Sequence, residues 1–260
     1  MELATLIGLV IGWGVMILAN ALEGGHLSSL WQYTAFLIVV GGTLGATFIS
    51  FPLKDVLNLP KIIGLTFQKS PYDPAALIPM LSGYADKARR EGLLALETEL
   101  AAQDDPFLRK GLQMVADGID PHTVRELMET ELTFIASRHA ASFGILEAMG
   151  GYAPTMGIIG TVMGLIHVLG NLSEPAKLGS AIAVAFVATL YGVWTANLLW
   201  LPLATKLKRR SEEEILAREM MVTGILAIQA GENPQIVEDK LKGFLAPKLR
   251  PGLMPEEALR

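Results

Sequence analysis

Apolar residues are concentrated in four long blocks of this chain instead of recurring as periodic stripes. The blocks contain no Asp, Glu, Lys or Arg, and they cover residues 3–22, 33–53, 148–172 and 178–205. About twenty apolar residues, each rising roughly 1.5 Å, span a hydrocarbon core of roughly 30 Å. A charge near the centre of a span costs roughly 2.5–3.5 kcal/mol, so four charge-free blocks predict four transmembrane helices. The first block is expected to be a retained transmembrane helix and not a cleaved signal peptide. A signal peptide carries basic residues before its apolar run, whereas Glu2 is the only charged residue here.

Basic residues between the blocks predict the orientation of the chain. The segment between the second and third blocks carries ten Lys and Arg, the segment after the fourth block carries another ten, and the two short connections share only Lys177. Lys and Arg accumulate in the cytoplasmic loops of membrane proteins. We therefore expect a multi-pass membrane protein with both termini and the long middle segment in the cytoplasm.

The polar segments show helical spacing and no strand-like alternation of useful length. The expected fold is an all-α integral membrane protein with a helical cytoplasmic domain inserted between transmembrane helices two and three. The expected divisions are a transmembrane hairpin at 1–53, the cytoplasmic domain at 54–143, a second hairpin at 144–206, and a cytoplasmic helix with its tail at 207–260.

Helix boundaries in the middle segment follow from a few residues. Four apolar positions after Pro74 recur at helical spacing, namely Leu77, Leu81, Tyr84 and Ala88. Gly92 is expected to bend or divide this helix. The pair Asp120–Pro121 has the form of a helix start, where proline at the first turn is tolerated.

The segment after the fourth block allows two interpretations. Ser211 with Glu214 has the form of a capping box. The same residues could instead lie on the solvated face of a helix that continues out of the fourth span, and we favour this continuous helix. It is expected to end near Gly231–Pro234, where Gly, Asn and Pro cluster. The final stretch is predicted to be a frayed tail rich in proline, with Pro247, Pro251 and Pro255.

The composition argues against several classes of function. A net charge of −5 argues against nucleic acid as a partner. Cysteine is absent, the four histidines lie far apart, and no Walker loop, HExxH or GxSxG motif occurs. We therefore expect no enzyme and no resident metal or cofactor. The four blocks also lack the carboxylate that usually marks an ion pathway, so either the chain moves no ions or a partner supplies that group.

Small and hydroxyl-bearing residues are the notable polar features of the blocks. Three pairs of glycines at four-residue spacing predict close helix packing, namely Gly8 and Gly12, Gly41 and Gly45, and Gly160 and Gly164. Thr161 lies thirteen residues before Glu174, the expected centre of the turn between spans three and four, and Thr189 lies fifteen after it. The two hydroxyls are thus expected at similar depth, near mid-membrane, where they could line a hydrated path or help to strip water from a cation. Spacing alone favours the alternative, a hydroxyl bonded to a carbonyl of its own helix.

Two prolines lie near the expected cytoplasmic ends of spans three and four. Pro154 and Pro202 each remove a backbone hydrogen bond, and membrane helices tolerate such a kink. Two prolines near the same membrane face in successive spans also suit a joint that transmits movement.

Five segments carry a resemblance to a known family. They read MELATLIGL, LIVVGGTLGATF, RREGLLALE, GYAPTMGIIGTVMGLIHVL and AIAVAFVATLYGVWTANLLWLPLATKLKRR. These segments resemble the MotA/PomA family, the larger subunits of the bacterial flagellar stator. The similarity runs from Met1 to about Leu245, and the three-span ExbB/TolQ relatives fit less well.

The resemblance implies a motor subunit of the bacterial inner membrane. In this family five copies ring a dimer of a B subunit, which has a transmembrane aspartate and a peptidoglycan-binding domain. Ion flow between the subunits is thought to drive the flagellar rotor. The family's third-span and fourth-span prolines match Pro154 and Pro202. Its rotor-contacting charges, which would face the switch protein FliG, match Arg89 and Glu97, with Arg90 and Glu99 as neighbouring charges.

The resemblance also bears on the transported ion, sodium or proton. Sodium-type members carry a threonine where this chain has Thr161, whereas Thr189 occurs in both types. Sodium-type members often have two adjacent threonines in the fourth span, and this chain has Ala188 before Thr189. We favour sodium, held transiently near Thr161, because a cation that keeps its charge needs oxygen ligands in place of water. The alternatives are a related ion-driven complex with a non-flagellar task, or a membrane scaffold that conducts nothing.

Overall fold

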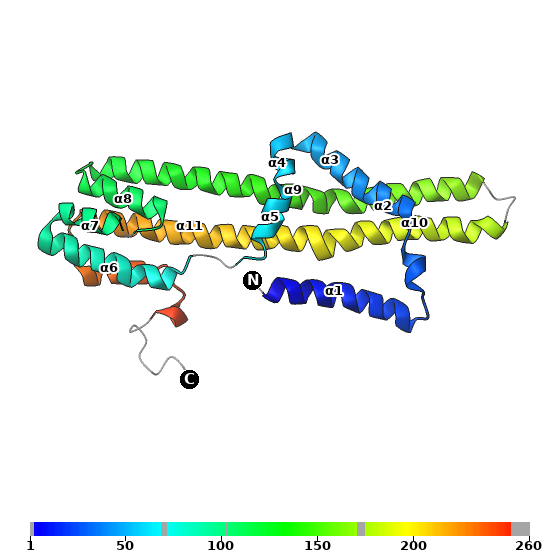
Figure 1. Ribbon diagram of the computed structural model, residues 1–260, viewed down its shortest axis with the longest axis horizontal. Helices are drawn as coiled ribbons and strands as arrows, with labels where there is room; N and C mark the ends of the chain where they lie inside the picture. The colour runs from blue at the N-terminus through cyan, green and yellow to red at the C-terminus, as the bar shows by residue number, and fades with distance from the viewer. Residues whose placement is uncertain (1–2, 69–71, 102, 171–174, 251–260) are drawn as a thin grey trace. The chain divides into compact units, whose positions relative to one another are not determined.

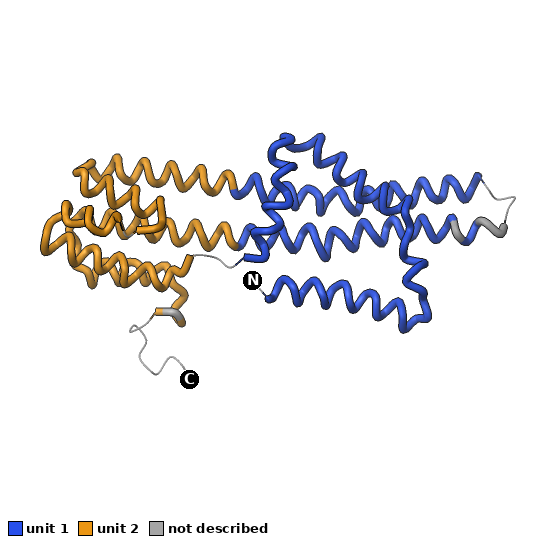
Figure 2. The backbone as a smooth tube through the Cα atoms, in the orientation of Figure 1, with its two compact units in different colours: residues 1–69, 139–209 blue, residues 70–138, 210–260 orange. Residues whose placement is uncertain are grey.

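The computed structural model describes residues 3–68, 72–101, 103–170 and 175–250. All regular secondary structure in these ranges is helical (Figure 1). The chain divides into two compact units, the first made of residues 1–69 and 139–209 and the second of residues 70–138 and 210–260 (Figure 2). The prediction of an all-α protein is therefore confirmed for the described residues.

The first unit contains the apolar spans. Four helical stretches are long and apolar enough to cross a membrane, and they cover Leu3–Leu22, Leu27–Ser50, Pro121–Gly170 and Ala181–Gln229. The elements of this unit in chain order are α1 (Leu3–Leu22), η1 (Leu27–Leu30), α2 (Tyr33–Phe36), η2 (Leu37–Gly41), α3 (Gly42–Ser50), α4 (Leu53–Leu57), α5 (Leu59–Leu65), α10 (Pro175–Thr195) and η4 (Ala196–Trp200). Two long helices, α9 (Pro121–Gly170) and α11 (Leu201–Gln229), contribute residues to both units. The four predicted spans are thus present as helices.

The two short helices α4 and α5 pack inside the first unit. Val56, Leu59 and Ile62 are buried in one apolar cluster together with residues of α9 and α11, including Leu146 and Leu203. The first unit therefore continues to residue 69, sixteen residues beyond the expected division at residue 53. Burial of these apolar side chains explains why the segment after the second span stays with the spans.

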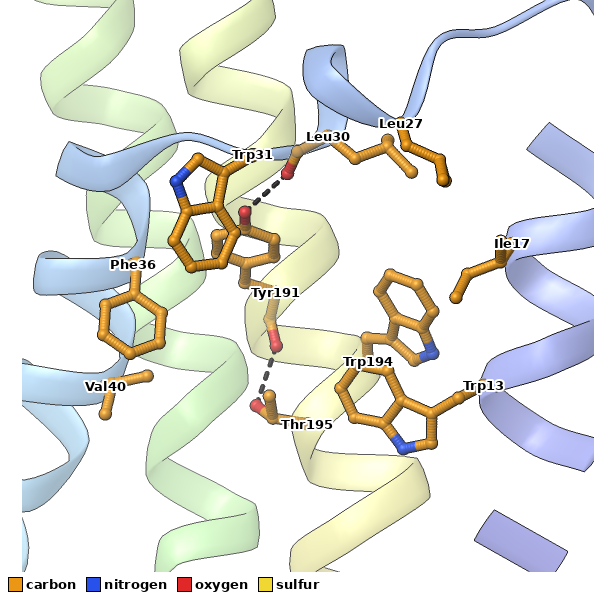
Figure 3. A pocket seen from close by; sticks show the side chains of 10 residues that line it. All are labelled: Trp13, Ile17, Leu27, Leu30, Trp31, Phe36, Val40, Tyr191, Trp194 and Thr195. Carbon is orange, nitrogen blue, oxygen red and sulfur yellow. Dashed lines mark hydrogen bonds between the residues drawn. The ribbon is translucent and has the colours of Figure 1, made fainter. Parts of the chain in front are cut away.

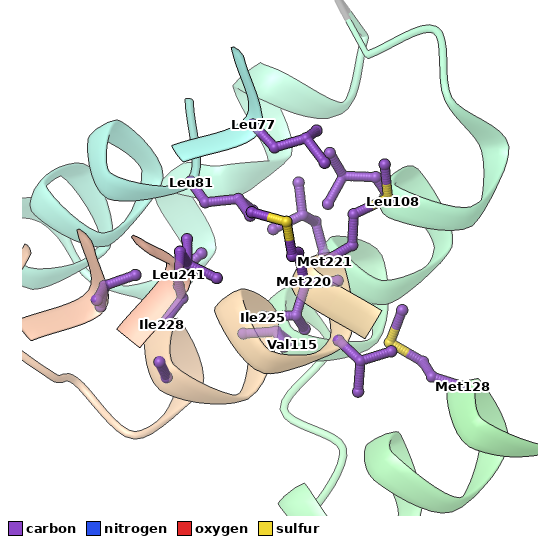
Figure 4. Packing of buried hydrophobic residues seen from close by; sticks show 14 of the residues in the cluster. Leu77, Leu81, Leu108, Val115, Met128, Met220, Met221, Ile225, Ile228 and Leu241 are labelled. Carbon is purple, nitrogen blue, oxygen red and sulfur yellow. The ribbon is translucent and has the colours of Figure 1, made fainter. Parts of the chain in front are cut away.

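The second unit is built around its own apolar core. Its remaining elements are α6 (Pro74–Glu91), η3 (Leu93–Leu96), α7 (Glu97–Leu100), α8 (Pro106–Ala116), α12 (Pro234–Lys242) and η5 (Pro247–Leu249). Leu81, Leu108, Met220, Ile225 and Leu241 are almost completely buried together (Figure 4). Removing such side chains from water contributes about 1.5–3 kcal/mol each, so the core alone gives this unit a reason to fold.

Helices in the second unit begin with a recurring pair, an Asp or Asn followed by proline. The side chain at the cap accepts hydrogen bonds from backbone N–H groups of the first turn at 2.9–3.1 Å, as at Asp73, Asp105, Asp120 and Asn233. The proline that follows has no N–H to leave unpaired. Hydrogen bonds from Thr123 lower the pKa of Asp120, because they stabilise its ionised carboxylate. The predicted helix start at Asp120–Pro121 is confirmed.

Two glycines end helices as predicted. Gly92 follows α6 with a φ of 88°, and Gly231 follows α11 with a φ of 68°, both in the left-handed region that favours glycine. Ser211 and Glu214 lie inside α11, so Ser211 does not cap a new helix and the continuous helix is the arrangement found. The expected turn centre at Glu174 lies outside the described residues, and so does the tail with Pro251 and Pro255.

We predict that Leu81→Ala weakens the second unit. Leu81 is fully buried and its methyl groups fill the space beside Gly224, so truncation leaves a cavity and lowers the free energy of unfolding by about 2–5 kcal/mol. Amide hydrogen exchange of α6 and α12 measures this loss. Leu94→Ala, at a leucine that is 66% exposed, is the matched control and should change exchange by less than about 0.5 kcal/mol. Equal exchange in both variants would contradict the assignment of Leu81 to the core.

Candidate functional site

The backbones of α9 and α10 approach each other closely at two glycines. A methyl group added at Gly192 would lie 2.5 Å from the carbonyl oxygen of Ala153, and one added at Gly157 would lie 2.9 Å from that of Ala188. Neither position has room for a side chain. Glycine therefore sets the distance between the two helices at this crossing.

Two further close contacts between small residues lie toward the C-terminal end of α9. Methyl groups added at Gly160 and Gly164 would meet the Cβ atoms of Ala188 and Ala185 at 2.6 and 2.7 Å. The predicted packing role of this glycine pair is borne out. Within the described chain, Gly8, Gly41 and Gly45 have no atom within 4 Å of an added methyl group, so their predicted role is not seen inside one subunit.

The close crossing brings Thr161 of α9 against Thr189 of α10. Their hydroxyls form a hydrogen bond, in which either group can be the donor. The Thr161 hydroxyl also lies 3.1 Å from the carbonyl of Gly157 in its own helix and 3.0 Å from the carbonyl of Ala185 in the other. The hydroxyl thus bonds a carbonyl of its own helix, as one interpretation of the sequence expected, and it also contacts the next helix. Its part in an ion path stays a prediction.

The depth of the threonine pair in the membrane stays a prediction. Gly160, next to Thr161, packs against Ile38, which lies at the centre of the helical stretch Leu27–Ser50. Gly42 of the same stretch packs against Met156, one turn earlier in α9. These contacts agree with a position near the middle of the second span.

Pro154 of α9 and Pro202 of α11 lie at similar positions along the two antiparallel helices. Pro154 is partly buried inside α9, and its Cα would be 3.1 Å from a methyl group on Gly192. Leu201, next to Pro202, packs on Gly150, one turn before Pro154. Pro202 itself is exposed and follows the π-helical segment η4, where the N–H of Leu201 bonds the carbonyl of Ala196 five residues back. A π segment beside a proline marks a point where the helix departs from regular geometry.

The chemistry available at the threonine pair is that of neutral oxygens. Two hydroxyls and the carbonyl of Ala185 meet at one place that is partly buried. Such oxygens can replace part of the hydration shell of a cation, but they carry no charge that balances it. Among the described residues no group of three His, Cys, Asp or Glu could hold a metal ion. The arrangement is therefore suited to transient contact with a cation.

The predicted rotor-facing charges gather at one corner of the second unit. Arg89 and Arg90 close α6, Gly92 reverses the chain, and Glu97 and Glu99 begin α7. Arg90 pairs with Asp86 at 3.0 Å, whereas neither Arg89 nor Glu97 has an ion pair in the described part of the chain, and both are exposed. These two charges are thus available to another molecule.

Sequence reasoning missed three participants in these arrangements. Lys87 lies 2.5 Å from Glu99, and this hydrogen bond raises the pKa of Lys87, so Glu99 is engaged within the unit. Gly157 and Gly192 form the tightest part of the crossing, although only Gly160 and Gly164 were singled out. The sequence did contain a signal for them, since small residues face each other as Gly157, Gly160 and Gly164 on one helix and Ala185, Ala188 and Gly192 on the other.

Comparisons with known proteins agree with the arrangement of these helices. The model of the MotA/TolQ/ExbB proton channel family matches residues 99–220, and the model of the motility protein A N-terminal region matches residues 6–92. The chain is 39% identical to motility protein A of Bacillus subtilis over 96% of this chain and 93% of that protein. It is 38% identical to chemotaxis protein PomA of Vibrio alginolyticus over 94% of this chain and 96% of that protein.

Solved structures give the same result. The structure is similar to a chain of the flagellar MotAB stator complex from Bacillus subtilis, with a TM-score of 0.90 and 39% identity over 97% of this chain and 100% of the other. It is also similar to a chain of C. jejuni MotAB, with a TM-score of 0.89 and 30% identity over 95% of this chain and 97% of the other.

We predict that Gly192→Ala separates α9 from α10. The added methyl group has no space against the carbonyl of Ala153, so the helices must move apart and the bond between Thr161 and Thr189 lengthens or breaks. Cross-linking of cysteines that replace Thr161 and Thr189 measures the separation of the two helices, and its yield should fall severalfold. Gly179→Ala on the same helix is the control, because nothing lies within 4 Å of a methyl group there. An unchanged yield in Gly192→Ala would refute the role of this glycine.

Proposed function

The chain belongs to the MotA/TolQ/ExbB proton channel family as a flagellar stator subunit, and we propose that it couples cation flow across the bacterial inner membrane to torque on a rotor. The family is one of proton channels and not of enzymes. The observation that carries the proposal is the bridge between Thr161 and Thr189, which places two hydroxyls together in apolar blocks that contain no Asp, Glu, Lys or Arg.

The apolar blocks contain no Asp or Glu, and this absence indicates what a partner subunit must supply. A cation inside a span needs a countercharge, because an unpaired ion in hydrocarbon is costly. The chain supplies only neutral oxygens, so the carboxylate comes from a second subunit with an aspartate in a single transmembrane helix. The similarity to chains of two solved MotAB structures supports this assignment. In the full proposal, five copies of this chain surround a B-subunit dimer that is anchored to peptidoglycan.

The proposed topology follows the distribution of basic residues. Both termini and the second unit lie in the cytoplasm, and the four spans of the first unit cross the membrane. In this orientation Pro154 and Pro202 lie on the cytoplasmic side of the threonine pair. We propose that these two prolines form a hinge. When the partner's aspartate is protonated or binds a cation, the conformation of the helices changes at this hinge. The irregular η4 segment beside Pro202 supports this role.

We assign sodium as the transported ion. Sodium keeps its charge throughout passage and needs oxygen ligands, whereas a proton can pass along hydrogen-bonded groups and carboxylates. The three oxygens that meet at Thr161 match the requirement of sodium for ligands. Sodium is the cargo of this site and is not resident in it.

The exposed corner at the end of α6 is assigned to the rotor. Arg89 and Glu97 carry opposite charges, are exposed, and lie on either side of the Gly92 turn and η3. Complementary charges on the switch protein FliG would steer and align this contact. Arg90 forms an ion pair with Asp86, and Glu99 forms one with Lys87. We therefore propose that Arg90 and Glu99 mainly stabilise this part of the second unit and contribute less to rotor binding.

We predict that Thr161→Ala abolishes sodium-dependent conductance. The substitution removes the hydroxyl that bridges the two helices and one oxygen ligand for the cation. Sodium flux in proteoliposomes that contain the chain and its B subunit measures the effect. Thr161→Ser should retain much of the flux. Thr155→Ala should retain all of it, because within the described residues the Thr155 hydroxyl bonds the carbonyl of Tyr152 in its own helix and no group of α10. Unchanged sodium dependence in Thr161→Ala would refute the sodium assignment.

We predict that Arg89→Ala and Glu97→Ala impair torque while assembly and ion flux stay intact. Both side chains are exposed, so their removal disturbs no internal contact. Torque on tethered cells, together with flux and recovery of the complex, separates the two effects. Arg125→Ala, at another exposed arginine of the second unit, is the control. Charge reversal on both partners should restore torque, and loss of assembly in either single variant would point instead to a structural role.

A further inference from the structure

Helix α1 runs antiparallel to α10 and the start of α11, and two contacts fix its register. Trp13 stacks on Trp194 with ring centroids 4.8 Å apart (Figure 3). Toward the start of α1, the Nζ of Lys206 donates a hydrogen bond to the hydroxyl of Thr5. The first apolar block begins at Leu3 and the fourth ends just before Lys206. Lys206 therefore marks the level at which the apolar spans end.

Basic residues gather at this level of the first unit. Lys208 and Arg209 follow Lys206 on α11, and Lys54 and Lys61 lie on the short helices α4 and α5. Both short helices share one apolar cluster with the turn of α11 that precedes Lys208. All of these basic residues except Lys206 are exposed, and these four are called the boundary cations below. They present positive charge to the surroundings at the end of the spans.

The boundary cations form no ion pair within the described residues. Glu212 and Glu213 follow Lys208 and Arg209 at the four-residue spacing that favours ion pairs on a helix, yet neither pair forms there. In the second unit Arg125 does pair with the glutamate four residues later. The two glutamates also lie about 6 Å farther along α11 from the spans. The charges closest to the spans are thus positive and lack a countercharge from this chain.

The short helix α4 also exposes apolar side chains beside these charges. Leu53 and Leu57 are 63% and 66% exposed, and their four-residue spacing places them on one face of the helix. Val56 of the same helix is buried in the first unit. An exposed leucine beside a lysine is typical of the membrane interface, where leucine enters the acyl boundary and lysine reaches the headgroups.

These observations point to a ligand in the membrane itself. We propose that the boundary cations bind the phosphate headgroups of acidic phospholipids in the cytoplasmic leaflet. Lys and Arg next to a membrane surface attract anionic lipid, and a phosphodiester offers each of them charged oxygens. A zwitterionic headgroup carries its own cation and neutralises them less. The inference rests on the proposed topology and not on ion transport, so it can fail while the stator function stands.

Fluorescence quenching tests the site in the complete complex of this chain with a cysteine-free B subunit. The bilayer contains equal amounts of phosphatidylglycerol and phosphatidylcholine. The chain has no cysteine, so Asn58→Cys, at the exposed junction of α4 and α5, takes a single bimane label. Bromine on the acyl chains of one lipid at a time quenches the label and reports which lipid lies beside it. We expect phosphatidylglycerol to be enriched about fivefold over phosphatidylcholine.

Salt and two charge variants identify the cause of the enrichment. It should fall toward equality in about 1 M salt, where the Debye length is about 3 Å. Lys54→Gln combined with Lys61→Gln should lower it to less than about twofold, because two of the four boundary cations are removed. Lys110→Gln combined with Arg125→Gln removes the same charge from the second unit and should leave the enrichment unchanged.

Three results would overturn the proposal. The first is equal quenching by the two brominated lipids, a comparison that needs only the label at position 58. The second is an enrichment that persists in the variant of Lys54 and Lys61, or that is lost equally in the second-unit variant. The third is quenching by neither lipid, which would mean that a neighbouring subunit covers this end of the spans. Sodium flux of the same samples, measured in parallel, reports separately on the stator function.

Discussion

The close approach of α9 and α10 at Gly157 and Gly192 is the constraint on which the rest of the first unit depends. The glycines leave no room for a side chain, so the two backbones touch and hold a fixed register. Helices in a membrane gain little from the hydrophobic effect, because lipid is as apolar as their own surface. Close backbone packing is therefore the main means of holding this hairpin together, and it determines which side chains meet across it.

The hydroxyl bridge is a consequence of that register. Thr161 reaches both the hydroxyl of Thr189 and the carbonyl of Ala185 only because the helices are this close. The result is a small group of oxygens without charge, in a set of spans without a carboxylate. Such a group can help a cation to lose water but cannot neutralise it, and this is the physical reason for assigning the countercharge to a partner.

Much of this architecture could be predicted from the sequence, because hydrophobic length and glycine and proline positions are local signals. The four spans, the helix start at Pro121 and the end of α6 at Gly92 all follow from such signals. The packing of α4 and α5 against the spans could not be predicted, because it depends on contacts of Val56 and Ile62 with residues far along the chain. The contact of Thr161 with the carbonyl of Ala185 could not be predicted either, because it depends on how closely α9 and α10 approach each other.

The central claim is that this chain supplies neutral oxygens and its partner supplies the charge. Cation flux in proteoliposomes that contain this chain alone, the B subunit alone, or both, under a sodium gradient and then under a proton gradient, tests that claim most directly. The account predicts flux only when both subunits are present, carried by sodium and abolished when the partner's transmembrane aspartate is replaced by asparagine. Flux through this chain alone, or flux of the complex that persists in the asparagine variant, would contradict it.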